Sequence, residues 1–364
     1  MKRYRLCILA GGRSAEHDVS LQSARNVLEA INPKKYDILL IGIDQSGRWY
    51  RQDVAQFLRP GPKPVLQTNG EEMILVPAPV EMPIRPLNSK KPAERVDVVL
   101  PILHGTYGED GTLQGALEMA GLAYVGAGVL GASVGMDKDV CKRLLRDAGI
   151  PVAKSRIVTR REWQLARLTY SALKRELGTV LFVKPCNLGS SVGISRARNP
   201  RELDAAMKRA LQFDTKVLIE ETIRGRELEC AVLGNDAPVA SAVGEIVPRK
   251  GFYSYEAKYL DDTGADLIVP AKLTSRQEAR LREMAVCAYQ ALCCEGMGRV
   301  DFFLQERTGK LYVNEINTIP GFTRISMYPR LWQESGLSYT RLIDKLIALA
   351  LERRRIRRRL RVVR

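Results

Sequence analysis

The sequence predicts an α/β chain of several domains, which opens with a βαβ unit and continues with two segments that mix helices and strands. Its length of 364 residues is more than one ordinary hydrophobic core organises, and it suits two or three domains. Two short apolar runs, 5–10 and 37–43, flank a stretch whose apolar residues approximate helical spacing. The composition, with 45% hydrophobic and 27% charged residues, is typical of a soluble globular protein.

The first domain is expected to span residues 1–127. After the βαβ unit, residues 59–95 contain eight of the eighteen prolines, which predicts surface hairpins and loops without a chemical role. A continuous apolar run then predicts a buried strand, and a helix follows it. These two elements are 96–103 and 113–120. Gly126 and Gly128 mark the domain boundary.

The second domain is expected at 128–221 and the third at 222–351. The second begins with a helix at 139–148, because Gly149 and Pro151 follow it as helix terminators. Its predicted strands are 180–185 and 193–196. The third ends with a helix at 339–351, whose apolar positions predict packing on that domain.

Residues 352–364 form a basic tail with eight arginines and one glutamate, so they supply a large part of the net charge of +16. These arginines have no continuing apolar stripe, and we expect a solvated end whose removal after Glu352 spares activity. No aromatic residue interleaves the tail, so nucleic acid is expected only as a non-specific partner of it.

Seven cysteines without a C-x-x-C pair predict neither a disulfide framework nor a zinc site, which favours a reducing cytoplasm. The charged start and the short apolar run after it resemble a signal peptide, but the run ends at Gly11 and Gly12 and is interpreted as a strand. No apolar run approaches the length of a membrane span.

A loop rich in glycine and serine, 186–193, lies between the two predicted strands of the second domain. Its glycines allow backbone amides to approach a phosphate closely, and its serines, including Ser190 and Ser191, add hydroxyl donors. Lys184, just before the loop, adds a positive charge, and Lys138 is a second candidate phosphate ligand. A glycine-rich hairpin turn without a ligand is an equally good interpretation of the loop alone.

Two apolar runs between Arg299 and Gly321 are separated by a turn at 306–309, which predicts an antiparallel hairpin. Asp301 would then lie across from a second acidic segment, in which side chains two residues apart share a face. These oxygen-bearing side chains, Asp301, Glu315 and Asn317, suit one or two Mg²⁺ ions. The alternative is an amphipathic hairpin with one face in water.

Carboxylates also follow the predicted strand 217–219. They are Glu220, Glu221 and Glu227. Near an inter-domain crossing they could bind an adenine amine and ribose hydroxyls, and they could equally be surface charges.

Taken in order, the motifs of this chain resemble those of the D-alanine–D-alanine ligase family, most of all its A-type bacterial subfamily. The similarity spans about residues 5–350. It rests on Gly11 to Ser20, on His104-Gly105 with Gly108 to Gly111, on Met136 to Lys138, on Lys184-Pro185 with Gly189 to Gly193, on Glu256 to Tyr259, on Arg299 to Asp301 and on Asn314 to Gly321.

The resemblance implies an ATP-grasp fold, in which a Rossmann-like N-terminal domain is followed by two α+β domains that clamp the nucleotide. It also implies the reaction: ATP phosphorylates the carboxylate of one D-alanine, and the amine of a second attacks the acyl phosphate, which yields the dipeptide for peptidoglycan synthesis. Two Mg²⁺ or Mn²⁺ ions and a homodimer are expected with it.

Site residues carried over from the family fall into three groups. The nucleotide and its metal ions would be held by Lys138, Lys184, Ser191, Glu220, Glu221, Glu227, Lys258, Asp301, Glu315 and Asn317. The first D-alanine and the tetrahedral oxyanion would be bound by Glu16, His104, Arg299 and a backbone amide near Gly321. Closure over the site and the second D-alanine would depend on Ser190, Tyr259, Ser326 and Met327.

From the residues alone, Glu16 is equally well explained as a carboxylate at a helix start, and a lone histidine such as His104 is usually structural. Cys186 is interpreted as a small filler in the loop, without a basic partner that would activate it. The strongly positive net charge is not typical of the family.

Two other classes of function stay open. One is a ligase of the same fold that joins D-alanine to D-lactate or D-serine; Tyr259 favours the dipeptide. The other is a nucleic-acid-binding protein on a ligase scaffold, which only the net charge supports. Loss of a predicted metal ligand would favour it, and every predicted metal ligand is present.

Overall fold

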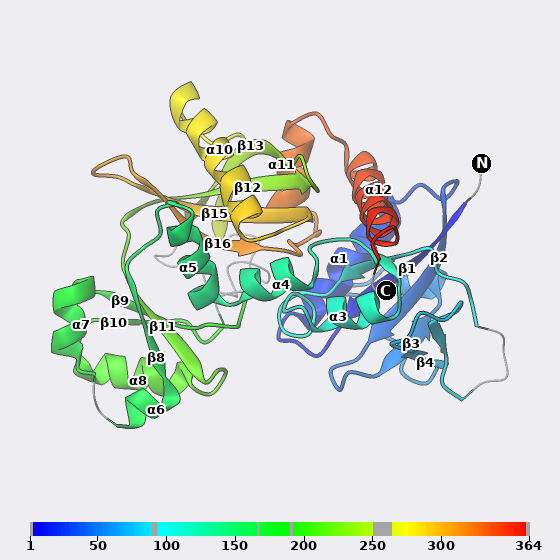
Figure 1. The fold of residues 1–364 in the computed structure, drawn as a ribbon, viewed down its shortest axis with the longest axis horizontal. Helices are drawn as coiled ribbons and strands as arrows, with labels where there is room; N and C mark the ends of the chain where they lie inside the picture. Colours follow the sequence, from blue (N-terminus) through cyan, green and yellow to red (C-terminus); the bar gives the residue numbers. More distant parts are fainter. Residues whose placement is uncertain (1–2, 89–92, 166–167, 190–191, 250–263, 362–364) are drawn as a thin grey trace.

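The computed structural model describes residues 3–88, 93–165, 168–189, 192–249 and 264–361. Within these ranges the strands form three separate sheets, which follow one another along the chain (Figure 1). The sheets fall within 1–127, 128–221 and 222–351, and we retain these ranges as the proposed domains.

Across its described strands, the N-terminal sheet has the order β5-β4-β3-β2-β1-β6-β7. The strands are β1 (Tyr4–Gly11), β2 (Tyr36–Ile43), β3 (Trp49–Gln52), β4 (Glu72–Leu75), β5 (Ile84–Pro86), β6 (Val98–Ile102) and β7 (Ala123–Tyr124). β1 is parallel to β2 and β6, as the predicted βαβ unit requires. The proline-rich segment contributes β4 and β5 to one edge. The helices are α1 (His17–Ala30), α2 (Val54–Phe57) and α3 (Thr112–Met119).

The central sheet has the order β10-β9-β11-β8 in the part of the chain described, with all pairs antiparallel. Its strands are β8 (Ser155–Thr159), β9 (Leu181–Pro185), β10 (Ser195–Ala197) and β11 (Lys216–Glu221). The helices of this region are α4 (Val129–Met136), α5 (Lys138–Asp147), α6 (Arg160–Gln164), α7 (Tyr170–Leu177) and α8 (Pro200–Ala210). A hydrophobic cluster of its own, which includes Leu173, Leu181 and Met207, holds this sheet to its helices.

The C-terminal sheet is antiparallel, with the described strands in the order β14-β13-β12-β15-β16. They are β12 (Gly225–Gly234), β13 (Val239–Pro248), β14 (Ala265–Ile268), β15 (Gly296–Gln305) and β16 (Leu311–Asn317). β15 and β16 are the predicted hairpin. The remaining helices are α10 (Ser275–Ala291), α11 (Met327–Glu334) and α12 (Tyr339–Arg357).

One hydrophobic cluster joins the first and third sheets. It contains Leu6 and Leu100 of the N-terminal sheet together with Tyr328 of α11 and Leu346 of α12. Figure 1 shows α12 beside α1 and β1. The first and third domains therefore share a core, whereas the central sheet has a separate one.

The prediction that the last helix ends at residue 351 is wrong. α12 continues to Arg357, and Arg353 is only 5% exposed because it has partners that a local pattern does not show. Its guanidinium donates to the carbonyl oxygens of Gly126 and Tyr124, lies 4.4 Å from the Tyr124 ring centroid and is 3.5 Å from Glu295. The first part of the arginine segment thus ties the third domain to the first.

Truncation after Glu352 is therefore expected to destabilise the protein, against the sequence-based expectation. The change would leave two buried carbonyls unsatisfied, which costs about 2–5 kcal/mol and lowers Tm by several degrees. Thermal melting of the truncated chain measures this effect. Truncation after Arg358 is the matched control and should melt like the full chain, because Arg359, Leu360 and Arg361 are exposed. Equal melting of all three proteins would contradict the prediction.

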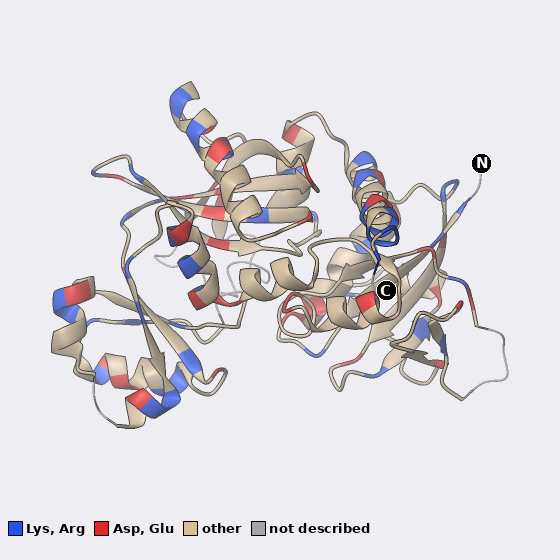
Figure 2. Ribbon diagram, in the orientation of Figure 1, with Lys and Arg blue, Asp and Glu red and all other residues tan. Residues whose placement is uncertain are grey.

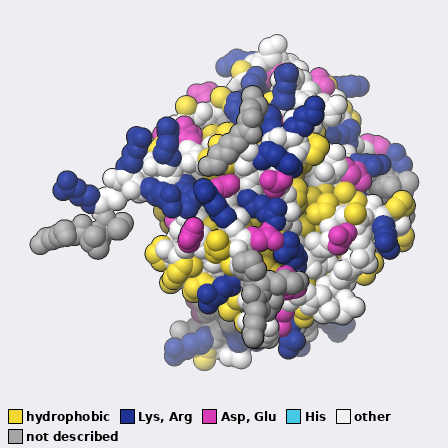
Figure 3. Space-filling view, turned by 90° about the vertical axis from the view of Figure 1, so that its right-hand side faces the viewer, with side chains coloured by type: hydrophobic (Ala, Val, Ile, Leu, Met, Phe, Trp, Pro, Cys, Tyr) yellow, Lys and Arg dark blue, Asp and Glu magenta, His cyan; other side chains and the backbone are white. Residues whose placement is uncertain are grey.

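Basic residues recur along α12, with acidic residues among them (Figure 2). The face on the right of Figure 1 carries Lys and Arg side chains spread over it with Asp and Glu between them (Figure 3). Among the described helices, none combines the length and apolar character that crossing a lipid bilayer requires.

Candidate active site

Two loops pack against the carboxylate of Glu16, which directly precedes α1 and is 6% exposed. A Cβ atom built on Gly105 would lie 2.6 Å from Glu16 Oε2, and one built on Gly189 would lie 3.0 Å from the same oxygen. A side chain at either glycine would force the carboxylate to move. This close approach brings the N-terminal domain and the glycine-serine loop of the central domain together at one carboxylate.

A buried carboxylate that the sequence analysis did not select, Glu109, connects the loop after β6 to the loop after β16. Its Oε2 accepts a hydrogen bond from the Gly105 amide at 2.8 Å, and its Oε1 accepts one from the Ile319 amide at 2.9 Å. Burial and the nearby charge of Glu16 raise the pKa of Glu109 to about 8, although both backbone bonds favour the ionised form. Glu16 and Glu109 therefore form an acidic pair in which burial and the charge of Glu16 favour the neutral form of Glu109.

His104 is buried, and both of its ring nitrogens have partners in the protein. Nδ1 lies 2.9 Å from the carbonyl oxygen of Ile319, which only accepts, so this nitrogen carries the proton. Nε2 is then the acceptor for the Ser23 hydroxyl at 3.2 Å. Burial lowers the pKa of His104 to about 4, with the charge of Arg299 acting in the same direction and the Ile319 bond opposing it. His104 is thus a neutral side chain that holds α1 and the 319–322 loop together.

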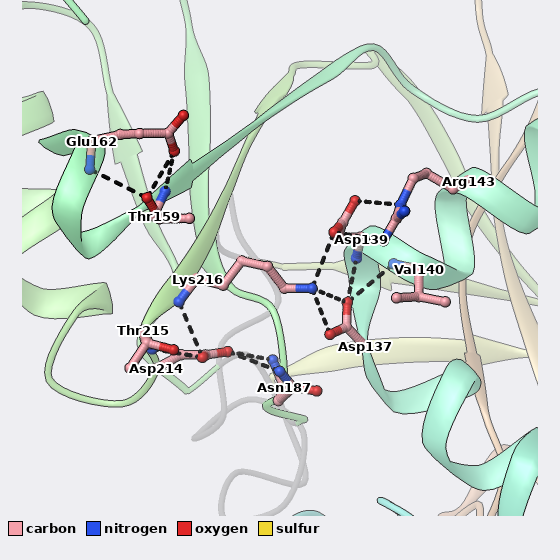
Figure 4. A network of polar contacts seen from close by, with 10 residues as sticks. All are labelled: Asp137, Asp139, Val140, Arg143, Thr159, Glu162, Asn187, Asp214, Thr215 and Lys216. Atoms are coloured by element: carbon pink, nitrogen blue, oxygen red, sulfur yellow. Dashed lines mark hydrogen bonds and ion pairs between the residues drawn. The ribbon is translucent and has the colours of Figure 1, made fainter. Parts of the chain in front are cut away.

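Helix α5 and the glycine-serine loop are both anchored to β11 and the turn before it (Figure 4). The side chain of Asp137 caps α5 and lies 2.7 Å from the ammonium of Lys216, the first residue of β11. Asp214 accepts a hydrogen bond from the Asn187 amide at 2.8 Å. These contacts place Lys138 at the first position of α5, beside the loop.

Lys138 links the loop to the C-terminal sheet. Its ammonium donates to the carbonyl oxygen of Leu188 at 2.6 Å and lies 3.4 Å from Glu315 Oε2. Lys184 of β9 donates to Glu220 at 2.7 Å and lies 3.4 Å from the Asn314 side-chain oxygen. The two predicted phosphate lysines therefore face the same strand, β16, from the central domain.

The predicted metal ligands lie together on the hairpin. Asp301 pairs directly with Glu315 across β15 and β16, and Asn317 donates to Asp301 at 3.0 Å. The side chain of Arg299 contacts both Asp301 oxygens at 2.7 Å and lies 3.0 Å from Glu229. Asp301 and Glu315 thus each have a basic partner, Arg299 and Lys138.

The donor set fits a hard divalent cation. Two carboxylates and an amide on adjacent strands provide the oxygen ligands that Mg²⁺ prefers. A cavity of about 40 Å³ has Asp301, Glu315, Glu227 and Glu229 in its lining, together with apolar residues that include Ile246 and Phe302. Within the described ranges, no three His, Cys, Asp or Glu side chains stand close enough together to hold an ion, so the predicted set depends on Asn317 as its third member.

A second cavity, of about 20 Å³, lies between the loop and β16, and its lining includes Glu109, Lys138, Gly189, Glu315 and Asn317. This volume has room for about one water molecule. A nucleotide phosphate would therefore enter only if the loop and β16 separate.

The segment after β16 places Gly321 next to Ser326. A Cβ atom built on Gly321 would lie 2.7 Å from Ser326 Oγ, which also accepts from the Thr323 amide at 2.9 Å. Ser326 directly precedes α11, and Met327 is buried in the core shared by the first and third domains. Helix α1 holds the same segment through Asn26, whose amide nitrogen lies 3.2 Å from the Phe322 carbonyl oxygen.

The remaining residues selected from the sequence do not form one group in the structure. Glu221 accepts from the Lys154 amide at 2.7 Å, and Glu227 lines the 40 Å³ cavity. Burial raises the pKa of the Cys186 thiol to about 12, which agrees with a filler. Four predicted residues lie outside the described part of the chain, namely Ser190, Ser191, Lys258 and Tyr259.

Sequence reasoning missed Glu109, Ser23, Glu229 and Lys142. Two of them had a local signal. Glu229 alternates with Glu227 on β12, and Lys142 follows Lys138 by one helical turn. Glu109 stands within the Gly108 to Gly111 motif but was not selected, whereas Ser23 is recognisable only from its contacts with His104 and the 319–322 loop.

Comparisons with family models, with curated proteins and with solved structures all identify D-alanine ligases. The family described as "D-ala D-ala ligase N-terminus" matches residues 5–127, and the one described as "D-ala D-ala ligase C-terminus" matches residues 144–348. A D-alanine–D-alanine ligase A of Chromobacterium violaceum is 49% identical over 98% of this chain and 97% of its own. The D-alanine–D-alanine ligase structure from Coxiella burnetii has a TM-score of 0.84 and 37% identity, and covers 98% of both chains. The VanG D-Ala:D-Ser ligase structure from Enterococcus faecalis has a TM-score of 0.83 and 38% identity, and covers 96% of this chain and 100% of its own.

Proposed function

The chain belongs to the D-alanine–D-alanine ligase family, and we propose from its site how it joins two D-alanine molecules using ATP. The γ-phosphoryl group passes to the carboxylate of the first D-alanine and leaves ADP and an acyl phosphate. The amine of the second D-alanine then attacks the acyl carbon, and phosphate leaves. The observation that carries the assignment of roles is the meeting of Glu16, the glycine-serine loop and the lysines that face β16.

The nucleotide would bind between the central and C-terminal sheets. Lys138 and Lys184 would bind its phosphates, because both ammonium groups face β16, and we add Ser191 and Lys258 from the sequence motifs. Glu220, Glu221 and Glu227 would contact adenine and ribose. A carboxylate oxygen accepts more than one hydrogen bond, so the ion pairs of Glu220 are compatible with an adenine amine as a further donor.

Asp301, Glu315 and Asn317 would hold the divalent ions. When bound there, Mg²⁺ or Mn²⁺ would offset the negative charge that develops in phosphoryl transfer. The acidic lining of the 40 Å³ cavity supports this role. Lys138 pairs with Glu315, and Arg299 pairs with Asp301. These two cations reduce the repulsion between the neighbouring carboxylates.

Arg299 and the backbone amide near Gly321 would stabilise the tetrahedral oxyanion. Arg299 is held by Asp301 and Glu229, so its guanidinium needs no reorganisation when charge develops. Asn26 holds the segment that carries the amide.

Glu16 would bind the ammonium of the first D-alanine as a charge-assisted pair. His104 would act beside that substrate's carboxylate by positioning the loop, since it is neutral and both ring nitrogens are engaged. Ser326 and Met327 would bind the carboxylate of the second D-alanine. Ser190 and Tyr259 would close the site with Glu16.

Glu109→Gln is expected to flatten the pH dependence of D-alanine binding. In the native protein Glu109 loses its proton as pH rises toward about 8, and the added negative charge beside Glu16 favours the substrate ammonium, so affinity increases with pH. The glutamine carries no such proton, and its amide nitrogen faces a backbone N–H, which should lower kcat/KM about tenfold or more.

The measurement is kcat/KM for the first D-alanine between pH 6 and pH 9. Glu306→Gln, in the exposed turn of the hairpin, is the control and should follow the native profile. Superimposable profiles for the native protein and Glu109→Gln would contradict the role of the acidic pair.

The similarity to a D-Ala:D-Ser ligase makes D-serine a second candidate for the acceptor substrate. Phosphate release from ATP, measured with D-alanine, L-alanine, D-lactate and D-serine alone and in pairs, tests both functions together. Release with D-alanine alone, accompanied by the dipeptide, is the expected result. Release only when D-alanine is paired with D-serine or D-lactate would assign the alternative acceptor. A homodimer and non-specific contact of the exposed terminal arginines with polyanions are further proposals.

A further inference from the structure

Three buried charged side chains, one each from α5, β9 and β11, form one cluster. Lys142 of α5 forms an ion pair with Glu220 of β11 through Oε1. Lys184 of β9 lies 2.7 Å from Oε2 of the same carboxylate. The side chains of Lys142, Lys184 and Glu220 are 2%, 10% and 3% exposed. Each oxygen of one carboxylate therefore has its own lysine.

The carboxylate of Glu220 and the ammonium of Lys184 each favour the charged form of the other. Burial alone would raise the pKa of Glu220, but the charges of Lys142 and Lys184 outweigh it and lower this pKa to about 2. Burial also opposes the charge of Lys184, and Glu220 outweighs it, so the pKa of Lys184 is raised. The cluster thus holds two lysines but only one carboxylate away from water. Outside it, the carboxylates of Glu227 and Glu315 also favour the charged form of Lys184, and a bound anion would add to them.

The position of the cluster indicates where that anion would lie. The ammonium of Lys184 faces Asn314 on β16, next to Glu315. Lys142 lies one turn further along α5 than Lys138, which reaches the glycine-serine loop. Lys216 of β11 pairs with Asp137 at the start of α5 and so holds this helix against β11, the strand that carries Glu220 (Figure 4).

We propose that Lys142 is a positioning residue for nucleotide binding: it neutralises Glu220, so that more of the positive charge of Lys184 is left for the phosphates. Without Lys142, the carboxylate would be fully paired with Lys184, and the cluster would be neutral. The proposal rests on the proposed function, in which Lys184 binds phosphate. It adds a residue that never touches the nucleotide.

The test compares ADP with adenosine as probes, by titration calorimetry on the full-length protein. Lys142→Met removes the charge at similar length, and Lys142→Gln removes it while keeping a hydrogen-bond donor for Glu220. Both should weaken ADP about tenfold or more and adenosine less than about threefold, because only ADP carries the charge that the cluster attracts. The double variant Lys142→Met with Glu220→Gln restores a net charge of one positive unit. In this double variant, the ratio of ADP affinity to adenosine affinity should return most of the way to the native value.

Lys208→Met is the matched control, since this lysine also pairs with a carboxylate in the central domain, Asp204, but is 72% exposed. It should leave both affinities unchanged. Equal losses of ADP and adenosine affinity in both Lys142 variants, or no recovery in the double variant, would reduce Lys142 to a structural role and overturn the inference. Absence of ADP binding by the native protein would instead overturn the proposed function.

Discussion

Glu315→Gln is expected to lower the rate of dipeptide synthesis by about 10²–10⁴ while the protein still folds cooperatively. The change removes one negative charge from the proposed metal site and keeps the size of the side chain. The remaining ligands, Asp301 and Asn317, would hold a divalent ion more weakly. Lys138, which lies 3.4 Å from Glu315, would also lose its partner.

Phosphate release at increasing Mg²⁺ concentration measures this effect, and excess Mg²⁺ should recover part of the activity. Glu306→Gln is the matched control, because it makes the same change in the turn of the same hairpin, away from the proposed ligands. Native turnover by Glu315→Gln at low Mg²⁺ would remove Glu315 from the metal site.

Arg299→Ala is expected to lower kcat by about 10²–10³, the range that is typical of deleting one oxyanion donor. The KM for ATP should change little, because the charge that Arg299 stabilises develops only when the second amine attacks. The alanine variant also leaves two carboxylates, Asp301 and Glu229, without this cation, so loss of stability is expected too.

Arg299→Lys separates the two effects. It keeps a positive charge between the carboxylates and should preserve the fold, but an ammonium cannot reproduce the paired donors of a guanidinium. We therefore expect this variant to melt close to the native temperature and still to lose at least about tenfold in kcat. A folded Arg299→Lys protein with native kcat would exclude the oxyanion role.

Much of the hairpin could be predicted from the sequence, because strand alternation and turn composition are local properties. The pairing of Asp301 with Glu315 follows from two apolar runs joined by a short turn. The extra residue at Asn314, where the register shifts between Asp301 and Phe302, could not be predicted, since a bulge depends on how two strands pair. Lys138 and Lys184 were also identified locally, from their positions at a helix start and before a glycine-rich loop.

The roles of other charged groups are visible only in the structure. Glu220 looked like a nucleotide contact or a surface charge, and it proves to be buried between two lysines, one of them 78 residues earlier in the chain. His104 is neutral because burial lowers its pKa, against the opposing effect of the Ile319 hydrogen bond. The altered pKa values of Glu109 and His104 likewise depend on burial and on neighbours that the chain brings together from distant segments.

The sequence by itself determined the element types, the hairpin and the order of the motifs, because these depend on periodicity, turn residues and near neighbours. The tertiary structure decided where α12 ends and which charges are compensated. Arg353 looks like the start of a solvated tail until its guanidinium meets the carbonyls of Tyr124 and Gly126, more than two hundred residues away. A charged side chain has no intrinsic preference that reveals its partner, so its burial follows from the packing of whole domains.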